Sequence, residues 1–167
     1  LAQRPGVLAV AGVRHEGNKV GYSSYGPEVG ISAPAGNCVN ETGPCLYPLY
    51  TTGNDGQYTP GNDVYTSQTS EITVGTSFST PLVSGVAGLM WSVQPGLSPS
   101  QLISRMKSSA KPFVYDSSLP VCPAVVPSGT QVGQCNCTTT TCGAGLLNAL
   151  GAVNEALRPI ADFSVGG

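Results

Sequence analysis

Residues 75–90, which decide the fold, read Gly-Thr-Ser-Phe-Ser-Thr-Pro-Leu-Val-Ser-Gly-Val-Ala-Gly-Leu-Met. This order predicts a tight glycine turn followed by a helix that is apolar almost all the way round, as buried helices are. Ser77 falls at the junction, in the first turn of that helix. The first turn of a helix has unpaired backbone N–H groups and partial positive charge, which can stabilise a developing oxyanion. The position therefore suits a nucleophilic serine.

The same stretch resembles the active-site serine segment of the subtilases, the subtilisin-like serine peptidases. Their pattern is G-T-S-x-[AS]-[ST]-P followed by a helix of small residues. Its fixed positions are filled here by Gly75, Thr76, Ser77, Ser79, Thr80 and Pro81. Phe78 stands where many members have methionine, and Leu82 where many have histidine. The resemblance implies that Ser77 is the nucleophile and that Gly75 and Thr76 support the turn and the oxyanion region.

Four further segments resemble the same family, in the same order along the chain. They are residues 6–11, 22–26, 31–34 and 142–149, so the resemblance extends from residue 1 to about residue 157. It matches the C-terminal half of the family's catalytic domain. The resemblance implies an α/β fold with a subtilisin-like, mainly parallel sheet, helices on both faces and long disulfide-bearing loops. We expect residues 1–167 to form one compact unit.

A serine nucleophile needs a base, a group that orients the base, and donors for the oxyanion. In subtilases the aspartate, the histidine and the oxyanion asparagine precede the first strand matched here. The only histidine of this sequence is His15, in the polar turn 14–19. We interpret His15 as a solvated turn residue; the alternative is a triad of His15 and Ser77 with Asp55 or Asp63. On the first interpretation, the isolated chain should neither hydrolyse peptides nor react quickly with fluorophosphonates.

The sequence starts at Leu1, with neither an initiator methionine nor a signal peptide. We therefore expect either one product of a peptidase nicked after the oxyanion asparagine, or a deliberately expressed piece of it. In both cases the expected partner is the N-terminal half of the same peptidase, as a separate or lost chain. The substrates that the resemblance implies are proteins or peptides.

Composition favours a secreted or extracellular protein, with periplasmic transit if the source is Gram-negative. Only 10% of the 167 residues are charged, and 22 glycines and 14 prolines indicate many loops. The net charge of −2 provides no basic surface for nucleic acid. No apolar run approaches the ~20 residues that span a bilayer, so we expect no membrane partner.

Six cysteines indicate disulfides and an oxidising compartment. They are Cys38, Cys45, Cys122, Cys135, Cys137 and Cys142. Local clustering favours a bond between Cys38 and Cys45, with the other four pairing among themselves. Zinc is the competing interpretation, but the C-x-C-x4-C spacing that begins at Cys135 differs from the usual zinc pattern. We therefore expect no metal at these cysteines.

Hydrophobic patterning predicts the elements around the serine. Continuous apolar runs at 7–13 and 29–34 predict buried strands, and residues 72–74 lead into the serine turn. The helix after Ser77 should end near Val93, before Gln-Pro-Gly, with its proline in about the first turn.

A capping signal predicts a second helix. Ser98, Pro99 and Gln101 supply an N-cap, a proline at the first helical position and the capping-box partner, and the helix should end near Ala110. Its predicted inner face is Leu102, Ile103 and Met106. A last amphipathic helix should open at 143–149 and run through Ala156. Residues 36–70 and 111–141 should be long loops, the first with room for a hairpin.

The serine-peptidase chemistry that the resemblance implies requires no cofactor. Beyond the cysteines, calcium is the one ion for which the sequence offers candidate ligands. Asp55, Asp63 and Glu71 flank a glycine-rich loop, although their spacing differs from the EF-hand pattern. A weak cation site of some family members would correspond to backbone carbonyls near Ala2, Arg4 and Val7. Asn40 and Asn136 begin N-glycosylation sequons, which arise by chance in such a chain and are silent in a bacterial protein.

The predicted function is a serine endopeptidase in which Ser77 is the nucleophile and its own N–H is one oxyanion donor. One alternative is a catalytically silent subtilase-like domain that serves for binding or as a scaffold. A weaker one is a small disulfide-rich adhesion module with a chance serine motif.

Overall fold

The computed structural model describes residues 4–38, 45–47, 49–66, 75–124 and 132–159. Four sequence predictions fall on other residues: the lead into the serine turn at 72–74, the sequon at Asn40, the carboxylate of Glu71 and the carbonyl of Ala2. These four lie outside the described residues.

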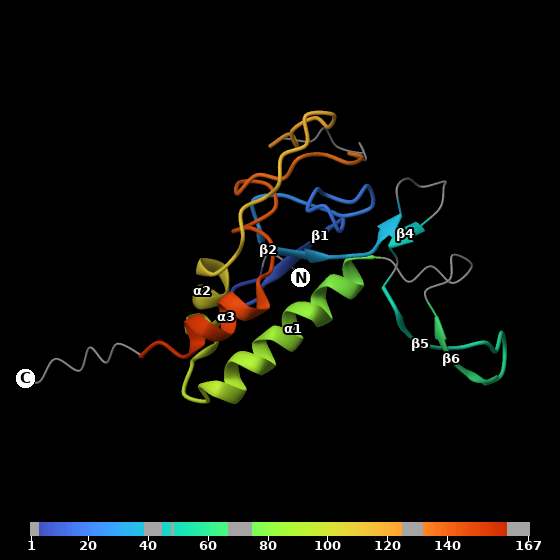
Figure 1. The fold of residues 1–167 in the computed structure, drawn as a ribbon, viewed down its shortest axis with the longest axis horizontal. Helices are drawn as coiled ribbons and strands as arrows, with labels where there is room; N and C mark the ends of the chain where they lie inside the picture. Colours follow the sequence, from blue (N-terminus) through green and yellow to red (C-terminus); the bar gives the residue numbers. More distant parts are fainter. Residues whose placement is uncertain (1–3, 39–44, 48, 67–74, 125–131, 160–167) are drawn as a thin grey trace, which may run out of the picture.

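Two parallel strands form the centre of the fold: β1, Ala9–Val13, and β2, Val29–Pro34 (Figure 1). Both confirm the strands predicted from the apolar runs. Segment 143–147 lies along the edge of β2 that faces away from β1. Ser32 N–H donates to Gly145 O at 3.0 Å, and Leu147 N–H donates to Ser32 O at 2.8 Å. Three extended segments therefore lie side by side.

The last helix, α3, begins later than predicted. It spans Ala149–Ala156 and is capped by Asn148, whose side chain accepts from Gly151 N–H at 3.1 Å. The prediction that this helix opens at 143–149 was wrong. Gly143 and Gly145 have φ values of +82° and +146°, which helices do not tolerate, and the residues between them and α3 pair with β2 instead.

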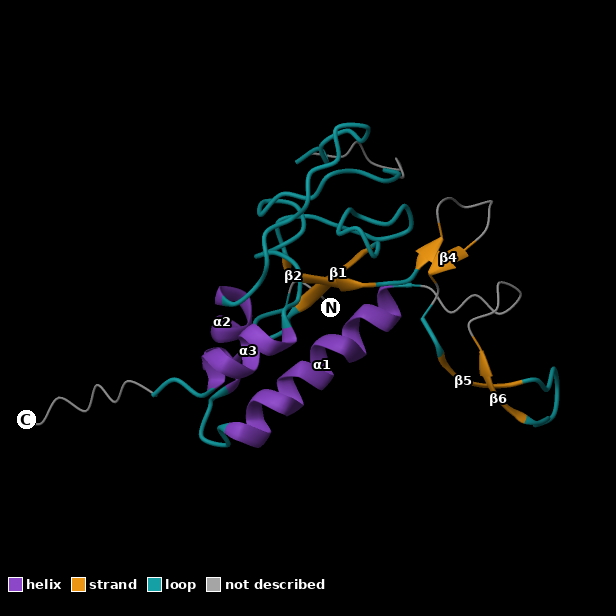
Figure 2. Cartoon of the chain, in the orientation of Figure 1, coloured by secondary structure: helices purple, strands orange, loops and turns teal. Residues whose placement is uncertain are grey.

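The other two helices confirm their predictions: α1 spans Thr76–Val93 and α2 spans Pro99–Ser108. In α2, Ser98 Oγ accepts from Gln101 N–H, and Gln101 Oε1 accepts from Ser98 N–H at 2.9 Å. All three helices of the described part lie on one side of β1 and β2, and loops lie on the other (Figure 2). The expectation of helices on both faces was therefore wrong for this part of the chain.

The larger hydrophobic cluster lies between the strands and the helices. Its buried members are Ile31, Ala33, Val83, Val86, Met90, Leu97, Leu102, Met106, Ala152 and Ala156. Leu102 and Met106 are the buried inner face predicted for α2, and Ile103 is partly buried against the same cluster. Among the described helices, none is long and apolar enough to cross a bilayer.

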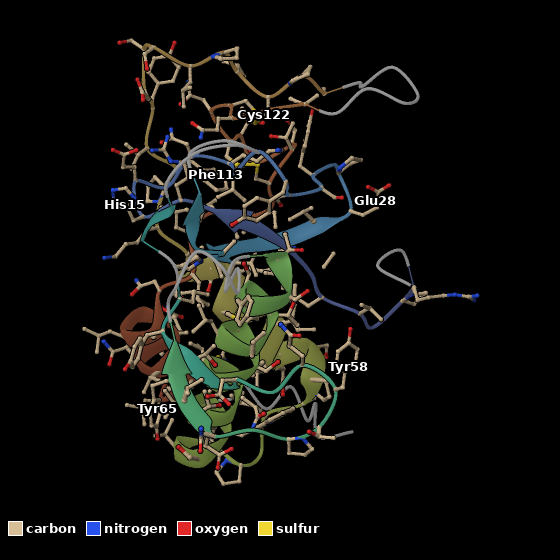
Figure 3. All side chains as sticks on the ribbon, turned by 90° about the vertical axis from the view of Figure 1, so that its right-hand side faces the viewer. His15, Glu28, Tyr58, Tyr65, Phe113 and Cys122 are labelled. Atoms are coloured by element: carbon tan, nitrogen blue, oxygen red, sulfur yellow. A yellow bond between two sulfur atoms is a disulfide. The ribbon has the colours of Figure 1, made fainter. Side chains whose placement is uncertain are left out.

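Disulfide-bearing loops cover the opposite face of the strands, where Figure 3 labels Phe113 and Cys122. Bonds join Cys122 to Cys135 and Cys137 to Cys142. These four cysteines therefore pair among themselves as predicted, in a connectivity that the sequence left open. The backbone register of β3, Asn37–Cys38, and β4, Cys45–Tyr47, sets the remaining two cysteines opposite each other. The side chains of those two cysteines lie outside the described part of the chain.

A second antiparallel hairpin, β5 (Thr51–Asn54) and β6 (Asp63–Thr66), projects to one side of the helices (Figures 1 and 3). Tyr50 and Tyr65 stack on it, with ring centroids 6.0 Å apart. The long loop predicted for residues 36–70 thus contains two antiparallel hairpins, and β1 with β2 is the one pair of parallel strands in the described part of the chain.

Candidate active site

Gly75 sets the entry of the chain into α1. It is the N-cap of α1, and its φ of +149° with ψ of 156° lies in a region that only glycine adopts without strain. Its N–H donates to Ala35 O, just after β2, at 2.8 Å, and its carbonyl accepts from Phe78 N–H at 2.9 Å. The turn is thereby attached to the carboxyl end of β2 while the backbone bends into the helix.

Ser77 is the second residue of α1 and is exposed. The N–H groups of a first helical turn have no intrahelical acceptor, and the helix dipole adds partial positive charge there. The backbone N–H of Ser77 is one of these groups. Its hydroxyl therefore lies beside donors that can stabilise negative charge on an attacked carbonyl oxygen.

Ser79 and Thr76 hold the start of α1 against the two strands. Ser79 is fully buried, and its Oγ donates to the end of β2, at 3.1 Å from Ala33 O and 3.0 Å from Pro34 O. Thr76 packs on β1, since a Cβ added to Gly12 would lie 3.1 Å from Thr76 Cγ2. The sequence contained no signal for either contact, because each partner lies more than thirty residues away along the chain.

Tyr22 supports the same turn, a role that sequence reasoning missed. Its hydroxyl donates to Ala35 O at 2.8 Å and to Gly36 O at 3.0 Å, beside the bond from Gly75. Burial raises the pKa of Tyr22 to about 12, against a lowering contribution from a hydrogen bond with the Gly75 backbone. Burial also raises the pKa of Tyr25. Tyr22 is therefore a neutral phenol at neutral pH, and its hydroxyl helps to hold the backbone of Ala35 and Gly36 next to the serine turn.

Deprotonation of Tyr22 should loosen this support at high pH. Between pH 10.0 and about pH 12, Tyr22 is more protonated in the folded state than in the unfolded state. Its contribution to the free energy of unfolding is therefore complete below pH 10 and falls as the pH rises through this window. We expect Tyr22→Phe to remove one late tyrosinate transition in ultraviolet difference titration. It should also flatten the fall of the unfolding midpoint in that window. Tyr58→Phe, at a residue 98% exposed, is the control, and equal effects of both variants would contradict the assignment.

Pro81 is the sixth residue of α1, early in its second turn, close to the predicted position at about the first turn. Proline has no N–H, so the carbonyl of Ser77 lacks the donor that would complete its helical hydrogen bond. Ser77 therefore combines a first-turn N–H with a carbonyl that has lost its regular helical donor.

The other candidate catalytic residues have separate roles in the described structure. His15 Nε2 lies 3.9 Å from Glu16 Oε1. Asp55 Oδ1 accepts from Asn62 N–H at 2.6 Å, and Asp63 Oδ1 accepts from Asn54 Nδ2 at 3.3 Å, so both carboxylates bond within the β5–β6 hairpin. A triad of His15 with either aspartate, and a calcium site at the hairpin, remain predictions.

Asn136, which begins a sequon, is a buried structural residue, only 2% exposed. Its Nδ2 donates to Asp116 O at 2.7 Å and to Leu119 O at 2.8 Å, and its Oδ1 accepts from Asn18 Nδ2 at 3.1 Å. The nitrogen that a glycan would modify is thus inside the folded chain.

The sulfur atoms of Cys122, Cys137 and Cys142 lie within 4.8 Å of one another. All three are in disulfides, so none offers a thiolate to a metal ion.

Comparison with known proteins points to a single family. The family model described as "Subtilase family" matches residues 2–152. An extracellular protease of Xanthomonas campestris pv. campestris is 32% identical over 153 residues, which are 91% of this chain and 20% of that protein. A thermostable alkaline protease of Halalkalibacterium halodurans is 32% identical over 122 residues, which are 71% of this chain and 27% of that protein.

A solved protease from Pseudoalteromonas arctica has a similar fold. Its TM-score with this chain is 0.69 at 28% identity, and the match covers 93% of this chain and 37% of that one. The chain therefore spans well under half the length of these three relatives.

Proposed function

The chain belongs to the subtilase family of serine proteases, and on that basis we propose that it contributes the nucleophile, Ser77, to a secreted serine endopeptidase. The observation that carries the proposal is the exposed position of Ser77 in the first turn of α1. Ser77 Oγ would attack the carbonyl carbon of the scissile peptide bond while a base takes its proton. The Ser77 N–H would donate to the resulting oxyanion. Collapse of the tetrahedral intermediate would break the C–N bond, and the amine would leave with the proton held by the base. Water, activated by the same base, would then hydrolyse the acyl-serine and restore the Ser77 hydroxyl.

In this proposal, the base that takes the proton of Ser77 does not come from this chain. His15 is its only histidine and lies beside Glu16. We propose that the base, the carboxylate that orients it and the asparagine donor for the oxyanion come from an N-terminal segment of the same peptidase. The relatives support this proposal, since each is much longer than the matched region.

The outer face of α1 is one feature that supports a partner segment. A helix that is apolar all round is normally buried on every side, but four large apolar side chains of α1 are 40–53% exposed. They are Leu82, Leu89, Trp91 and Val93. A Cβ added to Gly85 or to Gly88 would meet nothing within 4 Å, so another element has room to approach the backbone closely.

The outer edge of β1 is the second supporting feature. The N–H and the carbonyl of Gly12 point away from β2: the carbonyl accepts from Val20 N–H, and the N–H donates to Ser23 Oγ. Strand geometry repeats every two residues, so Val10 faces the same way, and no described strand pairs with Val10 on that side. An apolar cavity of about 200 Å³ adjoins it, lined by Leu8, Val10, Val83, Ala87, Trp91 and Leu102 among others.

The proposal is tested by completing the peptidase from two purified chains. The 167-residue chain alone should not react quickly with a fluorophosphonate, whereas the chain together with the N-terminal part of its parent should be labelled at Ser77. Mass spectrometry of the labelled peptide gives the site. Efficient labelling of the chain alone would contradict the need for a partner, and an unlabelled Ser77 in a stable complex would contradict its role as nucleophile.

A matched pair of variants separates docking from folding. Leu89→Glu places a charge on the outer face of α1, and Leu150→Glu places one at a 72% exposed position of α3. Both chains should fold alone, but only Leu89→Glu should fail to bind the N-terminal part in size-exclusion chromatography. Equal binding by the two variants would exclude the α1 face as the docking surface.

A further inference from the structure

A buried ammonium group lies on the loop-covered side of the strands. Lys19 is 0% exposed and is the largest of the fully buried side chains, although it falls in the polar turn predicted at 14–19. Its backbone N–H donates to Cys135 O at 3.1 Å, so the disulfide-bearing segment runs directly alongside it. That segment covers the turn, which explains why a residue typical of protein surfaces is enclosed here.

Four backbone carbonyls surround the ammonium nitrogen of Lys19. Nζ donates to Val20 O at 2.7 Å and to Gly21 O at 3.2 Å on its own turn. It also donates to Val132 O at 3.0 Å and to Gly133 O at 3.2 Å on the disulfide-bearing segment. The ring of Tyr25 lies below, with its centroid 5.4 Å from Nζ, a distance at which a cation is attracted to an aromatic face.

The four oxygen atoms around Nζ are the kind of ligands that bind a monovalent cation. Four neutral carbonyl oxygens with no carboxylate in the described contacts suit a single positive charge. The Nζ–oxygen distances of 2.7–3.2 Å are too long for calcium, which takes oxygens at about 2.3–2.6 Å. A buried charge needs such compensation, because desolvation without it is very costly.

We propose that these four carbonyls form a monovalent-cation site whose native occupant is the ammonium group of Lys19, and that the vacated site takes K⁺ or NH₄⁺. The tethered cation joins the turn at residues 20–21 to residues 132–133, so this end of the disulfide-bearing segment is held without a dissociable ion. Burial lowers the pKa of Lys19 to about 8, and the side chain is therefore still mainly protonated at pH 7.

Removal of the side chain at pH 7 tests the site by chemical rescue. In tetramethylammonium chloride, whose cation is too large for the cage, Lys19→Ala should unfold about 5 °C or more below the parent chain. Replacing that salt by KCl or NH₄Cl at equal ionic strength should recover most of the loss. The parent chain and Lys107→Ala, which removes an exposed lysine, should unfold at the same temperature in all three salts. A Lys19→Ala midpoint that is independent of the cation would overturn the proposal.

A second measurement uses the unaltered chain, in case Lys19→Ala does not fold. A water-soluble acetylating ester at pH 7 should modify the exposed Lys107 and Lys111 quickly, and Lys19 only at the rate of unfolding. Peptide mass spectrometry distinguishes the three lysines. Acetylation of Lys19 at the rate of the exposed lysines would equally overturn the proposal.

Discussion

Ser77→Ala is expected to lower kcat/KM of the completed peptidase by about 10⁴-fold or more, with little change in its unfolding midpoint. Without the hydroxyl no acyl-enzyme can form, and the residual rate comes from substrate binding and oxyanion stabilisation alone. The fold should not depend on this hydroxyl, because Ser77 is exposed and makes no side-chain hydrogen bond among the described contacts. Steady-state hydrolysis of a peptide substrate and a thermal unfolding curve measure the two effects.

Ser84→Ala is the matched control for this loss, since Ser84 is an exposed serine two turns further along the same helix. It should retain nearly all of the activity. Unchanged hydrolysis by Ser77→Ala would instead favour the alternative function, a catalytically silent domain that binds or acts as a scaffold.

Gly143→Ala is expected to destabilise the chain by about 3–5 kcal/mol, a large part of the stability of a domain of this size. The φ of Gly143 is +82°, which costs any other residue conformational energy. An added Cβ would also lie 2.5 Å from the carbonyl carbon of Gly30 and 2.6 Å from the nitrogen of Ile31. These are backbone atoms of β2, which cannot move without disturbing the core. Urea denaturation followed by circular dichroism gives the change in the free energy of unfolding.

Gly21→Ala makes the same chemical change at an open position. A Cβ added there would meet nothing within 4 Å, and its φ is not positive, so the variant should stay within about 0.5 kcal/mol of the parent. Similar losses in both variants would show that the contact with β2 is not the cause.

The elements that could be predicted are those whose signals are local. The bounds of α1 follow from the glycine before it and from Gln-Pro-Gly after it, and those of α2 follow from its capping box. The strands β1 and β2 follow from their continuous apolar runs. The position of Ser77 in a first helical turn was predictable for the same reason, since its motif lies within a few residues.

The start of α3 could not be predicted, because its apolar sequence is equally compatible with an extended segment. Segment 143–147 is extended since the edge of β2 offers it backbone hydrogen bonds. The burial of Lys19 and of Asn136 was hidden for a similar reason. Each has a partner more than a hundred residues away along the chain, Val132 for Lys19 and Asn18 for Asn136, and no local pattern encodes such a contact.

The sequence by itself determined the family, the helix that carries Ser77 and the pairing of four cysteines among themselves, because each depends on residues close together in the chain. Only the tertiary structure decided what holds that helix in place. Ser79 attaches the start of α1 to the end of β2, Gly75 attaches the serine turn to Ala35 just after that strand, and the Tyr22 hydroxyl donates to the same Ala35 carbonyl. In the described part of the chain, the tertiary structure also left the outer face of α1 exposed and Val10 without a partner on the outer edge of β1. Such features depend on which groups come into contact in the folded chain, and packing between segments far apart in the sequence determines those contacts.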